Sequence, residues 1–199
     1  MSSDPRNRSG FWNLPNTLTV MRIAAVPLMV WVLWNPPGVW MARLAMTIFV
    51  VAMITDIIDG YLARKWGLVS VIGAFLDPLA DKLMVVTTLV MLVAHGWLPA
   101  WMVALLICRE LTITALRTIA VSEGLVLAAS TLGKFKTSFQ STALGFLLWH
   151  HETVFLGLFP VDVHACGIVL MYFALFFSLV SGWSYLNSFF RHAGSLNTA

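Results

Sequence analysis

The chain has 199 residues, of which 59% are hydrophobic and 11% are charged, and its net charge at pH 7 is +3. Soluble domains carry about a quarter charged residues, so this composition excludes an ordinary soluble protein and indicates a membrane protein. The small charge, with no basic stripe, also argues against a nucleic acid partner. The cysteines Cys108 and Cys166 lie far apart in apolar runs and form neither a metal-binding motif nor a disulfide framework.

Apolar segments, taken in chain order, predict an all-α fold with six transmembrane helices. A bilayer core of about 30 Å needs about 20 apolar residues per helix. Turn sequences rich in Gly and Pro separate several of these segments, for example NPPG at residues 35–38 and HGWLP at residues 95–99. The whole chain, 1–199, is expected to form a single transmembrane domain. The expected spans are Leu18–Trp34, Val39–Ala63, Ile72–Ala94, Leu98–Val121, Phe135–Leu156 and Val163–Phe189.

The residues before the first span, about 1–17, mix aromatic and polar side chains. This mixture predicts a short helix at the membrane interface, and the polar first ten residues argue against a secretory signal peptide. The Lys and Arg residues outside the spans, and Lys136 at the start of the fifth, fall on one side of the predicted topology, so both termini are expected to face the cytoplasm. The residues on that side are Arg6, Arg8, Arg64, Lys65, Lys134, Lys136 and Arg191.

Four of the chain's nine acidic residues fall in one stretch, DIIDGYLARKWGLVSVIGAFLDPLAD at residues 56–81. Helical spacing places Asp56 and Asp59 on one face near the end of the second span. The same spacing places Asp77 and Asp81 on one face at the start of the third span. Because a short loop joins these helices, they are expected to be antiparallel neighbours whose acidic faces meet.

Four carboxylates gathered at a membrane boundary repel one another, and one unpaired buried charge costs several kcal/mol. A cation is therefore expected among them. Oxygen ligands without His or Cys favour Mg²⁺, Mn²⁺ or Ca²⁺ over Zn²⁺. Two divalent ions would balance four negative charges, and two-metal sites stabilise displacement at phosphorus. The alternative interpretation is that the aspartates make polar contacts between helices or reach toward the interface.

The stretch resembles the signature of the CDP-alcohol phosphotransferases. The resemblance implies an integral membrane enzyme with six transmembrane helices that displaces CMP from a CDP-linked lipid or alcohol. It implies that the four aspartates hold two divalent ions, Mg²⁺ or Mn²⁺, and that Asp81 is the catalytic base for the acceptor hydroxyl. It also implies that the remaining aspartates and the small or basic signature residues border the CDP moiety. The signature positions are Asp56, Asp59, Gly60, Ala63, Arg64, Gly73, Asp77 and Asp81.

Basic residues in and beside the spans bear on the acceptor. Arg109 and Arg117 lie in the fourth span, and Lys134 and Lys136 lie at the start of the fifth. A fifth basic residue, Arg22, lies in the first span. Charges inside spans are costly and usually functional, and this set could bind a phosphate, Arg through two hydrogen bonds and Lys as a point charge. The alternatives are that the two lysines are cytoplasmic anchors, and that Arg109 pairs with Glu110 or extends toward the membrane interface.

The stretches NLPNTLTVMR, RELTITALR and GKFKTSFQ are similar to those of family members that use sn-glycerol 3-phosphate as acceptor. That likeness implies transfer of a phosphatidyl group from CDP-diacylglycerol to glycerol 3-phosphate. It places Asn16 and Thr17 near the nucleotide or metals, and the four basic residues at the acceptor phosphate. It also implies a homodimer, surrounded by membrane lipid, in a bacterial inner membrane.

Three alternatives stay open. A sibling enzyme would use another acceptor, such as serine, inositol phosphate or a second phosphatidylglycerol, and the basic set is the feature that distinguishes it. A divalent-cation transporter would use the acidic cluster as its transport site, but the other spans offer only Glu110 as an acid deep in the membrane. A structural membrane subunit has no use for four clustered carboxylates.

Overall fold

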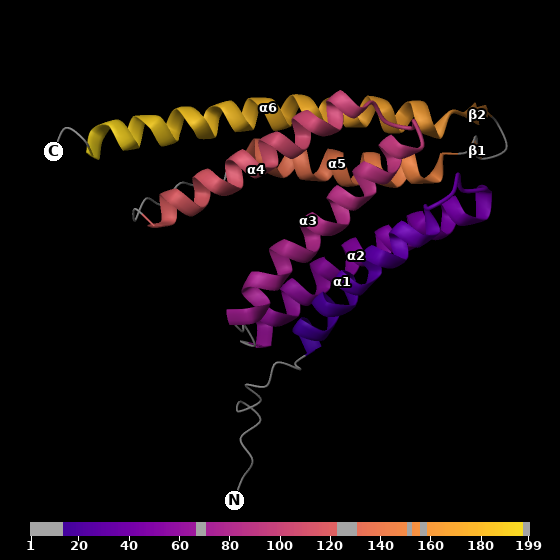
Figure 1. Ribbon diagram of the computed structural model, residues 1–199, viewed down its shortest axis with the longest axis horizontal. Coiled ribbons are helices and arrows are strands. Elements are labelled where there is room, and N and C mark those ends of the chain that lie inside the picture. Colours follow the sequence, from indigo (N-terminus) through magenta and orange to yellow (C-terminus); the bar gives the residue numbers. More distant parts are fainter. Residues whose placement is uncertain (1–13, 67–70, 123–130, 151–152, 156–158, 197–199) are drawn as a thin grey trace, which may run out of the picture. The chain divides into compact units, whose positions relative to one another are not determined.

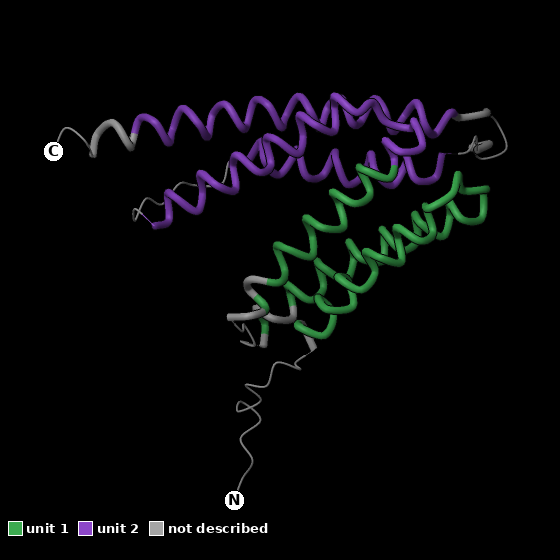
Figure 2. Tube along the Cα trace, in the orientation of Figure 1, with its two compact units in different colours: residues 1–91 green, residues 92–199 purple. Residues whose placement is uncertain are grey.

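The structure, a computed structural model, describes residues 14–66, 71–122, 131–150, 153–155 and 159–196. These residues form six helices and one two-stranded antiparallel sheet (Figure 1). The chain divides into two compact units, residues 1–91 and 92–199, and each is described by itself (Figure 2).

The first unit contains α1 (Leu14–Val32), α2 (Val39–Trp66) and α3 (Val71–Ala94) as far as Met91. Helix α1 packs against α2. Their core includes large side chains, Met29 and Leu33 near the end of α1 and Phe49 on α2, together with the small residues Ala42 and Ala45 of α2, all of them buried. Because alanine leaves little bulk on α2, the two backbones can approach closely there.

The second unit contains the end of α3, α4 (Ala100–Ser122), α5 (Thr131–Trp149), the strands β1 (Thr153–Phe155) and β2 (Phe159–Val161), and α6 (Val163–Leu196). Helix α6 packs against both α4 and α5, and α5 runs beside it in Figure 1. A Cβ atom placed on Gly167 of α6 would lie 2.9 Å from Cγ of Leu147 on α5. The glycine therefore permits the close approach of these two helices.

The prediction for the fifth helix was wrong at its end. The helix was expected to continue to Leu156, but α5 ends at Trp149 and β1 follows. His150 has a φ of 51°, a left-handed conformation that commonly ends helices. The strands pair with Val154 opposite Pro160. The residues beyond α5 are rich in β-branched and aromatic types, which favour strands.

The other helices follow the expected spans with small shifts at their ends. Helix α1 starts at Leu14, so residues 14–17 of the expected interfacial segment form its first turn, and residues 1–13 lie outside the described residues. Helix α6 continues to Leu196, beyond the expected end at Phe189.

Two stretches of the described helices, Val39–Tyr61 and Val163–Arg191, are long and apolar enough to cross a membrane. A third, Asn16–Val32, is apolar but shorter. Charged residues of the predicted sites lie on α2, α3, α4 and α5. Large apolar side chains are exposed in both units, as expected where lipid covers the protein. Among them are Trp31, Ile57, Val121 and Trp183.

Candidate functional site

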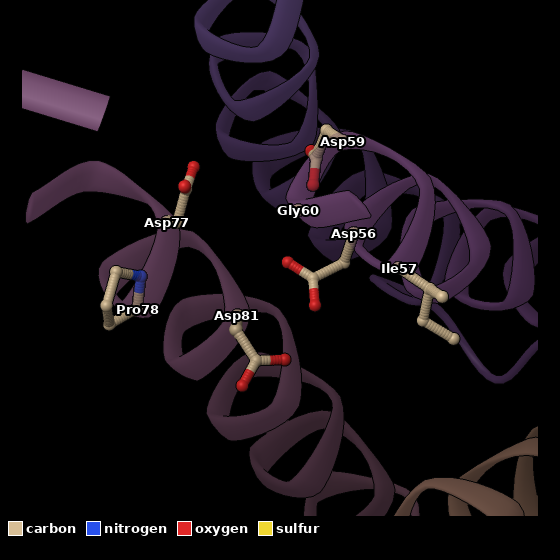
Figure 3. A pocket seen from close by; sticks show the side chains of 7 residues that line it. All are labelled: Asp56, Ile57, Asp59, Gly60, Asp77, Pro78 and Asp81. Atoms are coloured by element: carbon tan, nitrogen blue, oxygen red, sulfur yellow. The ribbon is translucent and has the colours of Figure 1, made fainter. Parts of the chain in front are cut away.

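The four predicted aspartates line one pocket in the first unit, between α2 and α3 (Figure 3). Its volume is about 410 Å³, and it is also lined by Gly60 and Pro78. Figure 3 shows Asp56 and Asp59 on one helix and Asp77 and Asp81 on the other, with their carboxylates bordering the space between. Gly60 has no side chain to fill the pocket, so a ligand can approach the α2 backbone there.

Arg22 of α1 supplies the positive charge for two of these carboxylates. One of its terminal nitrogens lies 2.5 Å from Oδ1 of Asp56, and the other lies 2.5 Å from Oδ2 of Asp59. Arg22 is 4% exposed and Asp59 is 3% exposed, whereas the side chain of Asp56 is 35% exposed. One guanidinium therefore bridges a buried and a partly open carboxylate and offsets one of their two negative charges.

Thr19, one turn before Arg22 on α1, contacts a third aspartate. Its hydroxyl donates a hydrogen bond to Oδ1 of Asp77, with an oxygen–oxygen distance of 2.5 Å. Thr19 itself is fully buried. Three of the four pocket aspartates are thus held by side chains from one helix.

The donor set fits a hard divalent cation by its chemistry, because carboxylate oxygens are the ligands that Mg²⁺ and Mn²⁺ prefer. Asp56 and Asp59 each give one oxygen to Arg22, which leaves each a second oxygen. In the arrangement described, and among the described residues, no three His, Cys, Asp or Glu side chains are grouped closely enough to hold a metal ion.

The residues predicted to border the nucleotide lie on the three helices of this unit. Asn16 is buried and Thr17 is half-buried on α1, and Gly73 is buried on α3. Gly60 lines the pocket. The side chains of Ala63 and Arg64 lie outside the described residues, although their backbone belongs to α2.

The predicted acceptor residues lie in the second unit, where two of them join one polar network. Arg109 of α4 donates from Nε to the carbonyl of Ser178, at 3.0 Å, and from a terminal nitrogen to Oγ of Ser181, at 2.7 Å. Its other terminal nitrogen lies 3.4 Å from Glu110. Lys136 of α5 lies 2.6 Å from the same Glu110 oxygen. The network therefore connects α4, α5 and α6.

This network confirms the alternative that Arg109 pairs with Glu110. Arg109 also donates hydrogen bonds to Ser178 and Ser181. The side chain of Arg109 is 15% exposed, and Gly182 of α6 makes room for it. A Cβ atom on Gly182 would lie 3.3 Å from Cγ of Arg109. Arg117 and Lys134, by contrast, are exposed.

Several residues of these sites were not assigned from the sequence. Arg22 was grouped with the basic residues that could bind a phosphate, whereas the structure pairs it with Asp56 and Asp59. Glu110 was noticed beside Arg109, but its contact with Lys136 was not expected. Thr19, Ser178 and Ser181 gave no signal, because Ser and Thr in helices commonly bond to their own backbone.

The chain resembles known proteins over most of its length. Residues 12–180 match the model of the CDP-alcohol phosphatidyltransferase family. The chain is 41% identical over 187 residues to the CDP-diacylglycerol–glycerol-3-phosphate 3-phosphatidyltransferase of Bacillus subtilis, covering 88% of this chain and 94% of the relative. It is 38% identical to the protein of that name from Pectobacterium atrosepticum, with 89% and 94% covered. It is 35% identical to a probable phosphatidylglycerophosphate synthase of Mycobacterium tuberculosis, with 95% and 87% covered.

Proposed function

Because the chain belongs to the CDP-alcohol phosphatidyltransferase family, we propose that it transfers the phosphatidyl group of CDP-diacylglycerol to sn-glycerol 3-phosphate. The products are phosphatidylglycerophosphate and CMP. The observation that carries the proposal is the pocket lined by four aspartates at the signature spacing. The choice of acceptor is supported by two relatives whose names specify glycerol 3-phosphate and which match over 94% of their length.

The four aspartates are the residues that would hold two divalent ions, Mg²⁺ or Mn²⁺. When bound, such ions stabilise the negative charge that develops on phosphate oxygens as the leaving group departs. Asp56 and Asp59 contribute from α2, and Asp77 and Asp81 contribute from α3. The support for this assignment is the oxygen-only donor set around one pocket.

Asp81 accepts the proton of the 1-hydroxyl of glycerol 3-phosphate, since a carboxylate beside a hydroxyl nucleophile can act as its base. The freed oxygen attacks the phosphorus that carries the diacylglycerol. A new P–O bond forms to glycerol 3-phosphate, and the P–O bond to CMP breaks, so CMP leaves with the electron pair. The nucleophile belongs to the substrate, and the reaction needs no Ser or Cys nucleophile.

The basic residues of the second unit bind the phosphate of the acceptor in this proposal. They are Arg109, Arg117, Lys134 and Lys136. The side chain of Arg109 is oriented by α6, because two of its nitrogens donate to Ser178 and Ser181. Its third nitrogen makes a longer contact of 3.4 Å with Glu110, and a phosphate would compete with that carboxylate for it.

The proposal also extends to the nucleotide and the membrane. The CDP moiety is bordered by Asn16, Thr17, Gly60, Ala63, Arg64 and Gly73. The two units act as one catalytic domain with six transmembrane helices, with both termini and the active site on the cytoplasmic side of a bacterial inner membrane. The exposed apolar side chains support a location in a membrane.

The proposal also includes a homodimer, and the lipid tails enter laterally between helices.

The test is CMP release by the purified full chain in detergent with CDP-diacylglycerol and Mg²⁺. Glycerol 3-phosphate, serine and inositol phosphate are added one at a time. We expect CMP only with glycerol 3-phosphate, and none with Asp81→Asn. The matched control is Asp162→Asn, because Asp162 caps α6 through the N–H of Ala165 and Asn caps a helix equally well.

Two results would contradict the proposal in different ways. Preference for another alcohol would show that the acceptor is wrong while the transfer chemistry stands. If no acceptor releases CMP from a folded protein, the enzyme assignment itself fails.

A further inference from the structure

Buried polar residues recur at every third position in the first turns of α1. Asn16, Thr19 and Arg22 are 2%, 0% and 4% exposed. Polar side chains buried in an apolar helix need hydrogen-bond partners. Thr19 and Arg22 find theirs on aspartates of the two neighbouring helices, so this face of α1 contacts the acidic pocket from behind.

Arg22 fixes which oxygens Asp56 and Asp59 present to the pocket. The planar guanidinium has two terminal nitrogens at a fixed separation, and each binds one oxygen of a different carboxylate. The two aspartates are one turn apart on α2 and repel each other without a cation between them. Their remaining oxygens, Oδ2 of Asp56 and Oδ1 of Asp59, are not used in these ion pairs. The Nε of Arg22 has no hydrogen-bond partner among the described residues. The guanidinium therefore binds the two carboxylates through its terminal nitrogens alone.

Thr19 binds one oxygen of an aspartate on α3. Its hydroxyl donates a hydrogen bond to Oδ1 of Asp77, and Oδ2 of that carboxylate takes no part in this bond. A threonine in a helix commonly donates to its own backbone, as Thr88 does to the carbonyl of Met84. The hydroxyl of Thr19 reaches an aspartate on another helix.

We propose that Thr19 and Arg22 are positioning residues, which hold one oxygen each of Asp77, Asp56 and Asp59 so that the other oxygens receive the divalent ions. The inference rests on the proposed function, because it takes the pocket as the metal site. Carboxylates that are oriented before an ion arrives lose less freedom when they bind it. Partners of this kind typically contribute about 10- to 100-fold to metal affinity.

Because Arg22 is positively charged, the direction in which its replacement changes metal affinity distinguishes two roles. If Arg22 acted only as a charge, its removal would tighten binding of a dication, and Lys would replace it fully. If Arg22 orients the two carboxylates, Lys fails as well, because an ammonium group lacks the planar pair of nitrogens. Arg22→Lys keeps the charge and loses the bridge, whereas Arg22→Met loses both.

The experiment is a Mn²⁺ titration of the purified full chain in detergent without lipid substrate, with free Mn²⁺ measured by electron paramagnetic resonance. We expect Thr19→Val, Arg22→Lys and Arg22→Met to weaken Mn²⁺ binding about 10- to 100-fold. We expect Thr19→Ser to bind as the wild type does, because it keeps the hydroxyl.

Two control variants make the same chemical changes elsewhere in the first unit. Thr88→Val removes a hydroxyl that is equally buried but donates to its own helix. Arg43→Lys changes an arginine that lies over the ring of Trp40, 5.4 Å from its centre. Both controls should bind Mn²⁺ with wild-type affinity.

Wild-type affinity in Thr19→Val and Arg22→Lys would overturn this inference alone, and so would tighter binding in Arg22→Met. If the Arg22 variants do not fold, the comparison of Thr19→Val with Thr19→Ser decides. A wild-type protein that binds no Mn²⁺ would overturn the metal site of the proposed function, and the inference with it.

Discussion

Glu110 connects the two basic side chains that the second unit buries most. Its carboxylate lies 2.6 Å from Nζ of Lys136 and 3.4 Å from Arg109. A carboxylate in this position keeps the two cations in place while no anion is bound. A phosphate that binds here must compete with Glu110 for the hydrogen bonds of Arg109 and Lys136. A phosphate dianion competes better than a neutral acceptor because it carries more negative charge.

At this scale we predict that Lys136→Met raises the KM for glycerol 3-phosphate roughly 10- to 100-fold, because one charge-assisted hydrogen bond contributes about 1.5–3 kcal/mol. Mn²⁺ affinity should not change, since the proposal assigns Lys136 to the acceptor phosphate and the aspartates to the metal ions. Initial rates of CMP release measure the KM. Lys65→Met is the control, because Lys65 is an exposed lysine near the ring of Tyr61. An unchanged KM in Lys136→Met would remove this lysine from the acceptor site.

The contact of α5 with α6 shows how much a single atom matters to a pair of helices. Gly167 leaves no room for a Cβ atom, because Leu147 would be 2.9 Å away at its side chain and 3.1 Å away at its backbone nitrogen. A backbone atom cannot move aside as a flexible side chain can. The separation of the helices is therefore set by this glycine, and the buried side chains Leu144, Leu148 and Met171 pack at that separation.

We predict that Gly167→Ala destabilises the protein by about 1–3 kcal/mol, the usual penalty for overpacking. Gly145 of α5 is the matched control, because a Cβ atom there meets nothing within 4 Å. Gly145→Ala should be neutral or stabilising by up to about 1 kcal/mol, since Ala favours helix more than Gly does. Thermal unfolding of both variants in one detergent gives the comparison. Equal melting temperatures for the two variants would show that the contact is not tight.

The helices that the sequence predicted well are those bounded by strong turn residues. The turn at Asn35–Gly38 correctly marked the start of α2 at Val39, and the turn after Ala94 marked the end of α3. The end of α5 was missed although His150, His151 and Glu152 interrupt the apolar sequence after Trp149. The short apolar run that follows them does not by itself distinguish a strand from a helix.

The same contrast holds for the candidate site. Its aspartates were found because acids stand out in an apolar chain, and helical spacing brought them together. Thr19 and Asp77 are 58 positions apart in the sequence, and Arg109 and Ser178 are 69 positions apart. Both contacts depend on how different helices pack. No local pattern marks either pairing, so only the folded structure reveals them.

For the whole molecule, the proposed reaction uses both units of the chain. The carboxylates that would act on the lipid donor lie in residues 1–91, and the basic residues that would bind the soluble acceptor lie in residues 92–199. In the proposed topology the polar chemistry takes place at the cytoplasmic face. The charges that flank the predicted spans agree with that orientation.

We predict that a fluorescent protein fused after Ala199 is fluorescent in bacterial cells, and that alkaline phosphatase fused at the same place is inactive. The first reporter matures in the cytoplasm, whereas the second requires the oxidising periplasm. Alkaline phosphatase fused within the turn at Asn35–Gly38 should be active, which is the control for that reporter. The opposite pattern would invert the proposed topology.

The ion pairs of Arg22 have a further consequence for the assembly of the protein in the bilayer. A charged side chain within a membrane helix is costly to insert, most of all near the centre of the bilayer. Helices α1 and α2 are consecutive, and Arg22 joins them through two carboxylates. The two helices can therefore enter the membrane together as a hairpin in which the charge of Arg22 offsets one of the two negative charges. In such a hairpin the basic helix precedes the acidic helix in the chain, so part of the cost of inserting Asp56 and Asp59 is offset within the hairpin itself.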